Sequence, residues 1–101
     1  MRIHFTEEAW NSLDKTTDFY LFELDIPAFI VDKIIRELLK KVQLLVENPY
    51  LGQKEPFLSH LGKNHRRIFY MNIKIIYRIE EDELYITDFF DSRQNPSKMK
   101  S

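Results

Sequence analysis

Residues 66–96 of this chain read RRIFYMNIKIIYRIEEDELYITDFFDSRQNP, and this stretch decides the fold. It contains three short runs rich in Ile, Tyr and Phe, the side chains that suit the pleated surface of a sheet. Asn72 separates the first run from the second, and Glu81-Asp82 separates the second from the third. Connections this short join antiparallel neighbours, so the sequence predicts a three-stranded antiparallel meander.

The second and third runs carry apolar side chains on both faces. An antiparallel sheet with one wet face alternates apolar and polar residues, whereas Ile75-Ile76-Tyr77 and Phe89-Phe90 break that alternation. In one interpretation the second face meets a partner or lines a groove. In the other, the central strands are buried on both sides within the chain.

The segments before the meander predict one strand and two helices. Residues 2–5 alternate as a short strand does, and Thr6 is placed to cap a helix that ends at Asp25-Ile26-Pro27. From Pro27 to Asn48-Pro49, apolar residues recur every three or four positions, the clearest helical period in the chain. Residues 50–64 hold both glycines and are expected to form a loop.

This order of elements favours an α+β fold. We expect an N-terminal strand, then an antiparallel helical hairpin, then the three-stranded meander, with the hairpin packed on one face of a four-stranded sheet. The 101 residues suit a single domain, 1–101, in which residues 92–101 form a polar tail.

Composition is that of a globular domain, with 44% hydrophobic and 31% charged residues. The absence of cysteine excludes disulfides and cysteine metal sites. No apolar run reaches membrane-spanning length and the N-terminus lacks the pattern of a signal peptide, so we expect a cytoplasmic location. Fifteen Lys and Arg against sixteen Asp and Glu give a net charge of −1, so any basic surface must be local.

Several motifs together resemble toxins of the RelE/ParE superfamily, from bacterial type II toxin–antitoxin systems. The resemblance covers nearly the whole chain and rests on the order and spacing of its motifs. After the opening strand these are Thr6-Glu7-Glu8-Ala9, the leucine-rich second helix with Asn48-Pro49-Tyr50-Leu51-Gly52, Arg66-Arg67-Ile68, Ile75-Ile76-Tyr77-Arg78-Ile79 and Asp91-Ser92-Arg93-Gln94-Asn95-Pro96.

The resemblance implies a small cytoplasmic protein that a cognate antitoxin neutralises. In this superfamily the antitoxin lays an extended or helical segment across the toxin's groove and sheet edge, which would account for an apolar second face. RelE-like members cleave mRNA on the ribosome, whereas ParE-like members act on DNA gyrase without a known hydrolytic site. An unprotected sheet edge also allows a homodimer as well as a toxin–antitoxin hetero-oligomer.

RNA cleavage of the RelE kind needs groups that stabilise phosphate charge and move protons. The resemblance implies an arginine of the second strand, here Arg66 or Arg67, which alternation directs to opposite faces. The further candidates are Arg93 for phosphate, Tyr77 and Tyr85 as proton donors, and His65 as a base.

Each candidate also has a structural interpretation. Arg66 and Arg67 can pair with neighbouring acids, Tyr77 can be a core aromatic, and Asp91 can hold Arg93.

For a toxin that acts by binding, the candidate contact residues for antitoxin or target are drawn from the meander. They are Arg66, Ile68, Tyr70, Tyr85, Phe89, Phe90 and Arg93.

Three features favour the ParE-like branch over an mRNA endonuclease. They are the near-neutral charge, the absence of a late His-Tyr or Tyr after Phe90, and the long apolar hairpin. A third hypothesis is an inactive relative that only binds its antitoxin. We expect no metal and no organic cofactor, because no glycine-rich phosphate loop or histidine cluster is present.

Overall fold

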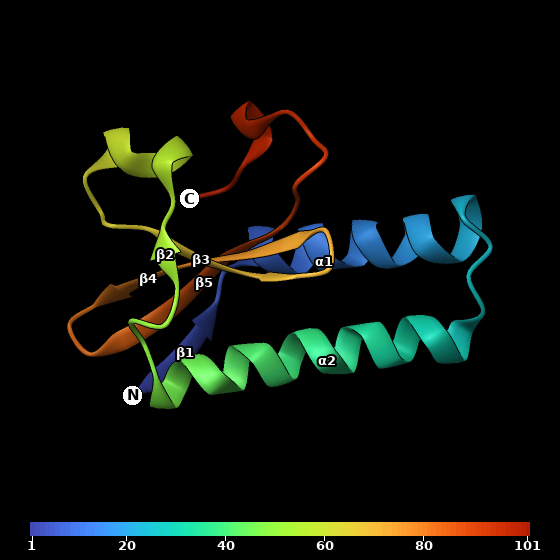
Figure 1. The fold of residues 1–101 in the computed structure, drawn as a ribbon, viewed down its shortest axis with the longest axis horizontal. Coiled ribbons are helices and arrows are strands. Elements are labelled where there is room, and N and C mark those ends of the chain that lie inside the picture. Colours follow the sequence, from blue (N-terminus) through green and yellow to red (C-terminus); the bar gives the residue numbers. More distant parts are fainter.

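The structure, a computed structural model, describes all residues from Met1 to Ser101. Two long helices lie on one side of a mixed sheet and two short helical turns lie on the other (Figure 1). The strands are β1 (Arg2–Phe5), β2 (Gln53–Lys54), β3 (Arg66–Tyr70), β4 (Ile73–Glu80) and β5 (Glu83–Asp91). The long helices are α1 (Glu7–Asp18) and α2 (Ala28–Glu47). The short 3-10 turns are Pro56–Leu61 and Pro96–Lys98.

The sheet has five strands in the order β1-β5-β4-β3-β2. The predicted α+β class and the antiparallel meander β3-β4-β5 are confirmed. The predicted four-stranded sheet is wrong in one respect, because β2 adds a fifth strand inside the expected loop of residues 50–64. A strand of two residues is too short to show alternation, and Gly52 and Pro56 beside it are typical of loops. β1 pairs in parallel with β5, which places the N-terminal strand beside the last strand of the chain.

The helical hairpin begins and ends close to where the sequence predicts. Thr6 caps α1, and its Oγ1 accepts a hydrogen bond from the Ala9 N–H at 3.1 Å. α1 continues into a π-helical turn, Phe19–Glu23, and the chain reverses at Asp25, where φ is +50°. α2 then follows directly after Pro27. Neither helix is long and apolar enough to cross a membrane.

The main core lies between the sheet and the helices, on what we call the helix face of the sheet. Buried side chains from both helices meet alternate residues of β4 and β5 there. This core consists of Ala9, Leu13, Tyr20, Val31, Ile34, Leu38, Val42, Leu45, Ile73, Ile75, Tyr77, Leu84, Ile86 and Phe89.

A β-bulge in β5 keeps buried residues on the helix face both before and after it. Ile76 pairs with Asp88 and Tyr77 pairs with Ile86, so Thr87 is the extra residue. The extra residue reverses the alternation, and Ile86 and Phe89 therefore both face the helices.

The opposite face, here called the back face, is covered by the chain itself. Ile76 and Phe90 pack against Leu58 from the first short turn and Met99 from the C-terminal segment. Of the two interpretations of the doubly apolar strands, the structure therefore supports burial within the chain.

The last residues of the chain, within the segment predicted as a polar tail, are folded onto the sheet. The Lys100 N–H donates to Asp88 Oδ2 at 2.9 Å, and the buried Met99 anchors this segment. A single apolar residue among polar ones carries no periodic signal, which is why the sequence did not indicate this contact.

Candidate functional site

The two arginines at the start of β3 lie on opposite faces, as alternation requires. Arg66 pairs with Tyr77 and so lies on the helix face, whereas Arg67 pairs with Ile76 and lies on the back face. Arg66 donates from Nη1 to the Gly52 carbonyl oxygen at 2.6 Å, and its guanidinium lies over the Tyr50 ring. Arg66 therefore supports the loop that follows α2.

Tyr77 is fully buried and holds the same loop. Its hydroxyl donates to the Pro49 carbonyl oxygen at 2.8 Å and accepts from the Gly52 N–H at 2.9 Å. Burial raises the pKa of the Tyr77 hydroxyl, while its hydrogen bond to Gly52 and the nearby Arg66 charge oppose that rise. A phenol with both hydrogen-bonding roles taken by backbone groups is placed to brace the loop.

Arg67 belongs to a compact ionic cluster on the back face, which we call the Glu55 cluster. Glu55 is 1% exposed, and its Oε1 lies 2.9 Å from Lys74 Nζ and 3.7 Å from Arg67 Nε. The exposed rings of Phe57 and Phe69 flank it, with Lys74 Nζ 5.4 Å and 5.8 Å from their centroids. Two cations and two accessible aromatic rings thus surround one buried carboxylate.

The side chains of His65 and Arg93 each bind a different partner. His65 is 2% exposed, its Nε2 lies 3.1 Å from the Ser101 carbonyl oxygen, and burial lowers the pKa of its ring. Arg93 is held by Asp91, with Nη2 2.7 Å from Oδ2, and this ion pair lowers the pKa of the Asp91 carboxyl. Asp91 pairs with Ile73, at the end of β4 farthest from the Tyr77 region.

The five predicted catalytic residues are therefore not brought together at one site, although Arg66 and Tyr77 are register partners and both hydrogen-bond to Gly52. His65, Arg66, Arg67, Tyr77 and Arg93 are divided between two faces and two ends of the sheet.

The remaining predicted contact residues differ in their accessibility. Phe89 and Phe90 are 1% and 3% exposed and belong to the two cores. Ile68 and Tyr70 are half-buried against the helix-face core, and Tyr85 is half-buried on the back face. Of the aromatic side chains around the meander, Phe69 is the exposed one.

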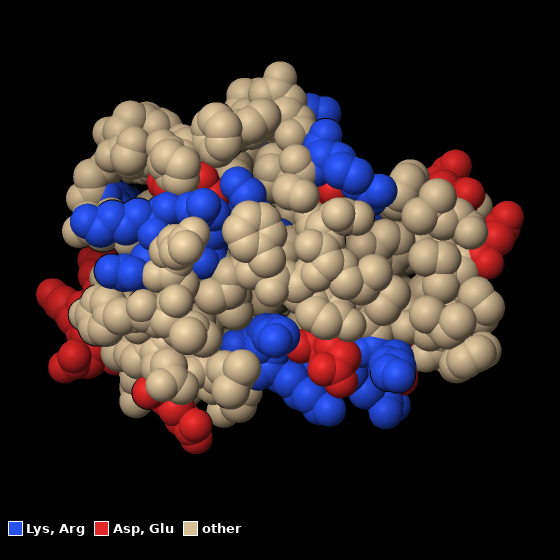
Figure 2. All heavy atoms as spheres, in the orientation of Figure 1, with Lys and Arg blue, Asp and Glu red and all other residues tan.

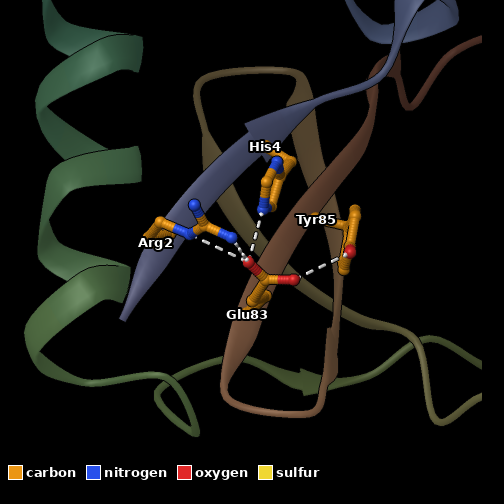
Figure 3. Close-up of polar contacts among 4 residues, drawn as sticks. All are labelled: Arg2, His4, Glu83 and Tyr85. Atoms are coloured by element: carbon orange, nitrogen blue, oxygen red, sulfur yellow. Dashed lines mark hydrogen bonds and ion pairs between the residues drawn. The ribbon is translucent and has the colours of Figure 1, made fainter.

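A second polar group on the back face, which we call the Glu83 cluster, contains the predicted residue Tyr85, whereas its other members were not predicted (Figure 3). Glu83 Oε1 lies 2.9 Å from Arg2 Nε and 3.0 Å from His4 Nε2, while Oε2 accepts from the Tyr85 hydroxyl at 3.2 Å. His4 stacks on Tyr85 at 4.8 Å, and the Arg78 guanidinium lies 4.5 Å from the centroid of the same ring. These residues come from β1, β4 and β5.

Hydrogen bonds from His4 and Arg2 lower the pKa of the Glu83 carboxyl to about 2, so it is ionised at neutral pH. Desolvation and the Glu83 charge raise the pKa of the Tyr85 phenol. The sequence signal was alternation, since residues 2 and 4 share a face with 83 and 85. That signal becomes useful only when β1 is known to pair with β5 in parallel.

A cavity of about 780 Å³ lies between α1 and the C-terminal segment. Asp88 lines it with Oδ1 buried and without a hydrogen-bond partner, and burial raises the pKa of this carboxyl. Three lysines, Lys15, Lys98 and Lys100, line the same cavity.

Basic side chains gather in separate patches despite the net charge of −1. Figure 2 shows Lys and Arg over the end of the sheet where β2, β3 and β4 lie, and again along the outer side of α2. On α2 these cations alternate with acids, as in the pairs Arg36–Asp32 and Lys40–Glu37. No group of three His, Asp or Glu side chains has the arrangement of a metal site.

Comparison with known proteins gives one family and one shared fold. A structure described as the chromosomal ParDE toxin–antitoxin system from P. aeruginosa matches with a TM-score of 0.70 at 20% identity, covering 90% of this chain and 95% of that one. No curated protein sequence matches significantly. The family model described as the ParE toxin of type II toxin–antitoxin system, parDE, matches residues 3–96. The chain therefore belongs to the ParE toxin family of type II toxin–antitoxin systems.

Proposed function

We propose that this protein arrests bacterial growth by binding DNA gyrase in the cytoplasm, and that a cognate antitoxin neutralises it. The observation that carries the proposal is the family match over residues 3–96, which spans every strand and both long helices. Gyrase as the target rests on the ParE-like resemblance.

The dispersal of the predicted catalytic residues supports action by binding. A nucleolytic site needs its acid, base and phosphate-binding groups within reach of one phosphate. Arg66 and Tyr77 are engaged in holding the loop after α2, and Arg93 is paired with Asp91, which lies opposite Ile73 at the start of β4. Removing any one of these side chains is expected to lower binding affinity or the stability of the fold.

The outer edge of β3 supports antitoxin binding by strand addition. β2 pairs only with Arg66 and Arg67, so residues 68–70 have no partner strand on that side. The His65 carbonyl oxygen accepts from the Glu55 N–H, and ladder alternation then directs the backbone groups of Phe69 to the same outer side. Exposed Phe69 and Met71 supply apolar contacts beside this edge.

Growth arrest tests the target. The protein is induced alone in bacteria, and incorporation of labelled thymidine and labelled amino acid is followed together. We expect DNA synthesis to fall first, and the purified protein to inhibit supercoiling by gyrase. An earlier fall in protein synthesis contradicts the gyrase proposal, and unimpaired growth with full expression identifies an inactive relative.

Edge variants test the antitoxin contact. Phe69→Pro removes an outward N–H without breaking a bond to β4, whereas Phe69→Ala removes only the ring. We expect the antitoxin encoded beside the toxin gene to lose at least tenfold affinity for Phe69→Pro, and less for Phe69→Ala. Equal affinities for the wild type and Phe69→Pro would contradict strand addition at this edge.

A second candidate function is mRNA cleavage, and the Glu83 cluster is the observation that favours it. His4, Tyr85 and Arg78 are the types of group that proton transfer and phosphate stabilisation require, and they lie on one face. Each is already engaged, however: His4 and Tyr85 with Glu83, and Arg78 with Glu80. Tyr85→Phe distinguishes the candidates, because a loss of orders of magnitude in mRNA cleavage with unchanged stability would support the ribonuclease.

A further inference from the structure

Two cations stand directly opposite each other at the β2–β3 edge without a counter-ion. Lys54 pairs with Arg66 in the register of the antiparallel strands, so their side chains share the helix face. Like charges directly opposite each other destabilise a sheet. Neither residue forms an ion pair with any Asp or Glu. The fold therefore carries an electrostatic cost that a bound anion would remove.

The two cations open onto a pocket. It has a volume of about 250 Å³ and is lined by Tyr50, Lys54, Asn64, Arg66 and Ile79, with no acidic residue among them. Arg66 uses Nη1 for the Gly52 carbonyl oxygen, which orients the guanidinium and leaves its other N–H groups for a ligand. The Tyr50 ring, with the guanidinium carbon of Arg66 5.1 Å from its centroid, forms one wall.

We propose that this pocket binds a carboxylate, the side chain of an Asp or Glu in a bound peptide segment. The pocket lies on the helix face at the start of β3, whereas the free edge of residues 68–70 begins at the other end of β2, beyond Gln53, so this contact is separate from strand addition at that edge. Assigning that segment to the antitoxin rests on the proposed function above, whereas the preference for a carboxylate rests on the pocket alone. An arginine beside a second cation is a suitable acceptor for a planar carboxylate.

The surroundings favour a peptide carboxylate over a nucleic acid. The pocket has the size of one anionic group, whereas nucleic acids need a basic surface that follows several phosphates. Ile79 of the pocket is followed directly by Glu80, Glu81 and Asp82, so the basic surface at this end is short. Figure 2 shows acidic side chains next to the basic patch at this end of the molecule.

The test uses the full chain and two probes, a hexaglutamate peptide and an oligothymidine of six nucleotides. Backbone amide shifts are recorded by NMR at physiological salt, which suppresses diffuse attraction. We expect the peptide to shift the amides around Tyr50, Lys54, Asn64 and Arg66, and Lys54→Gln to weaken its binding at least fivefold. Lys63→Gln, the matched change of an exposed lysine outside the pocket, is expected to alter binding less than twofold.

Three results would overturn the proposal. These are peptide shifts spread over all basic residues, equal peptide binding by Lys54→Gln and wild type, and tighter binding of the oligothymidine than of the peptide in the pocket. Lys54→Glu adds a positive test, because a resident carboxylate opposite Arg66 should abolish peptide binding and raise the melting temperature of the free protein.

The antitoxin itself separates this inference from the proposed function. If it binds the wild type and Lys54→Gln equally well, the carboxylate pocket is wrong and the toxin–antitoxin proposal stands. If it fails to bind the wild type, the proposed function fails, even where hexaglutamate occupies the pocket as expected.

Discussion

The hydroxyl of Tyr77 donates a hydrogen bond to the backbone carbonyl oxygen of Pro49 at 2.8 Å, across 28 residues of sequence. The same hydroxyl accepts from the Gly52 N–H, so one buried side chain joins β4 to the loop between α2 and β2. This loop leads into β2, which contains Lys54, and its Gly52 carbonyl oxygen accepts a hydrogen bond from Arg66. The position of the proposed carboxylate pocket therefore depends on a residue that does not line it.

Tyr77→Phe tests this bracing role. The change leaves the partly buried Pro49 carbonyl and the buried Gly52 N–H without their partner, and a buried unpaired group such as the latter costs about 1–3 kcal/mol. We expect lower stability in urea denaturation, with activity per folded molecule preserved. Tyr70→Phe, whose half-buried ring has no side-chain hydrogen bond, is the control. Wild-type stability combined with lost activity would instead assign Tyr77 a direct functional role.

Gly52→Ala is expected to destabilise the same loop for a steric reason. A Cβ at this position would lie 2.6 Å from the Arg67 carbonyl oxygen and 2.7 Å from the Tyr77 hydroxyl oxygen. Forced overpacking of this kind costs about 1–3 kcal/mol, measurable as a lower urea midpoint. Gly62→Asn is the comparison, because Gly62 has φ +68° in open space and Asn tolerates that conformation. Equal stability of Gly52→Ala and wild type would contradict the close packing.

Glu55→Gln tests the buried ionic cluster. The change leaves Lys74 and Arg67 on the back face without their carboxylate, and breaking a buried ion pair in this way costs about 3–5 kcal/mol. The double variant Glu55→Gln with Lys74→Met should recover part of that loss, since it removes one of the unpaired cations. A loss below about 1 kcal/mol in the single variant would show that solvent reaches the cluster freely.

The Glu83 cluster predicts a contribution to stability that depends on pH. The folded-state pKa of Glu83 is lowered to about 2 from 4.5, so its stabilisation is present above about pH 4.5 and is lost as pH falls toward 2. We expect Glu83→Gln to melt at a lower temperature than wild type at pH 7, with the difference shrinking toward pH 2. Glu81→Gln, in the exposed turn, should show no such trend. A difference that is constant with pH would contradict the ion-pair assignment.

The ionisation of Asp88 is expected to lower stability as pH rises, the opposite of the effect of Glu83. Burial raises the pKa of its carboxyl, so ionisation opposes folding, and this penalty is absent below the unfolded-state pKa and grows as pH rises through the folded-state value. Asp88→Asn keeps an oxygen to accept the Lys100 N–H and cannot ionise. We expect a higher melting temperature than wild type at pH 7 and near equality at pH 3. A lower melting temperature at pH 7 would show that the charge itself is needed.

The sequence by itself determined the class of fold, the helical hairpin, the meander and the resemblance to toxins. These follow from local regularities: side-chain periods of two and of three to four, a Thr6 cap, and turn residues between runs. Local regularities also place Arg66 and Arg67 on opposite faces, because side chains alternate along a strand. Such features persist because neighbouring residues along the chain specify them.

Only the tertiary structure decided which side chains meet across long separations. The parallel pairing of β1 with β5 brings His4 to Glu83, and β2 places Lys54 opposite Arg66. The folding back of Met99 onto Ile76 and Phe90 closes the apolar back face. These contacts join residues distant in the chain, and a two-residue strand or a lone methionine leaves no period to read. Pairing across the sheet is set by the packing of the whole domain, which is why the candidate sites became visible only in three dimensions.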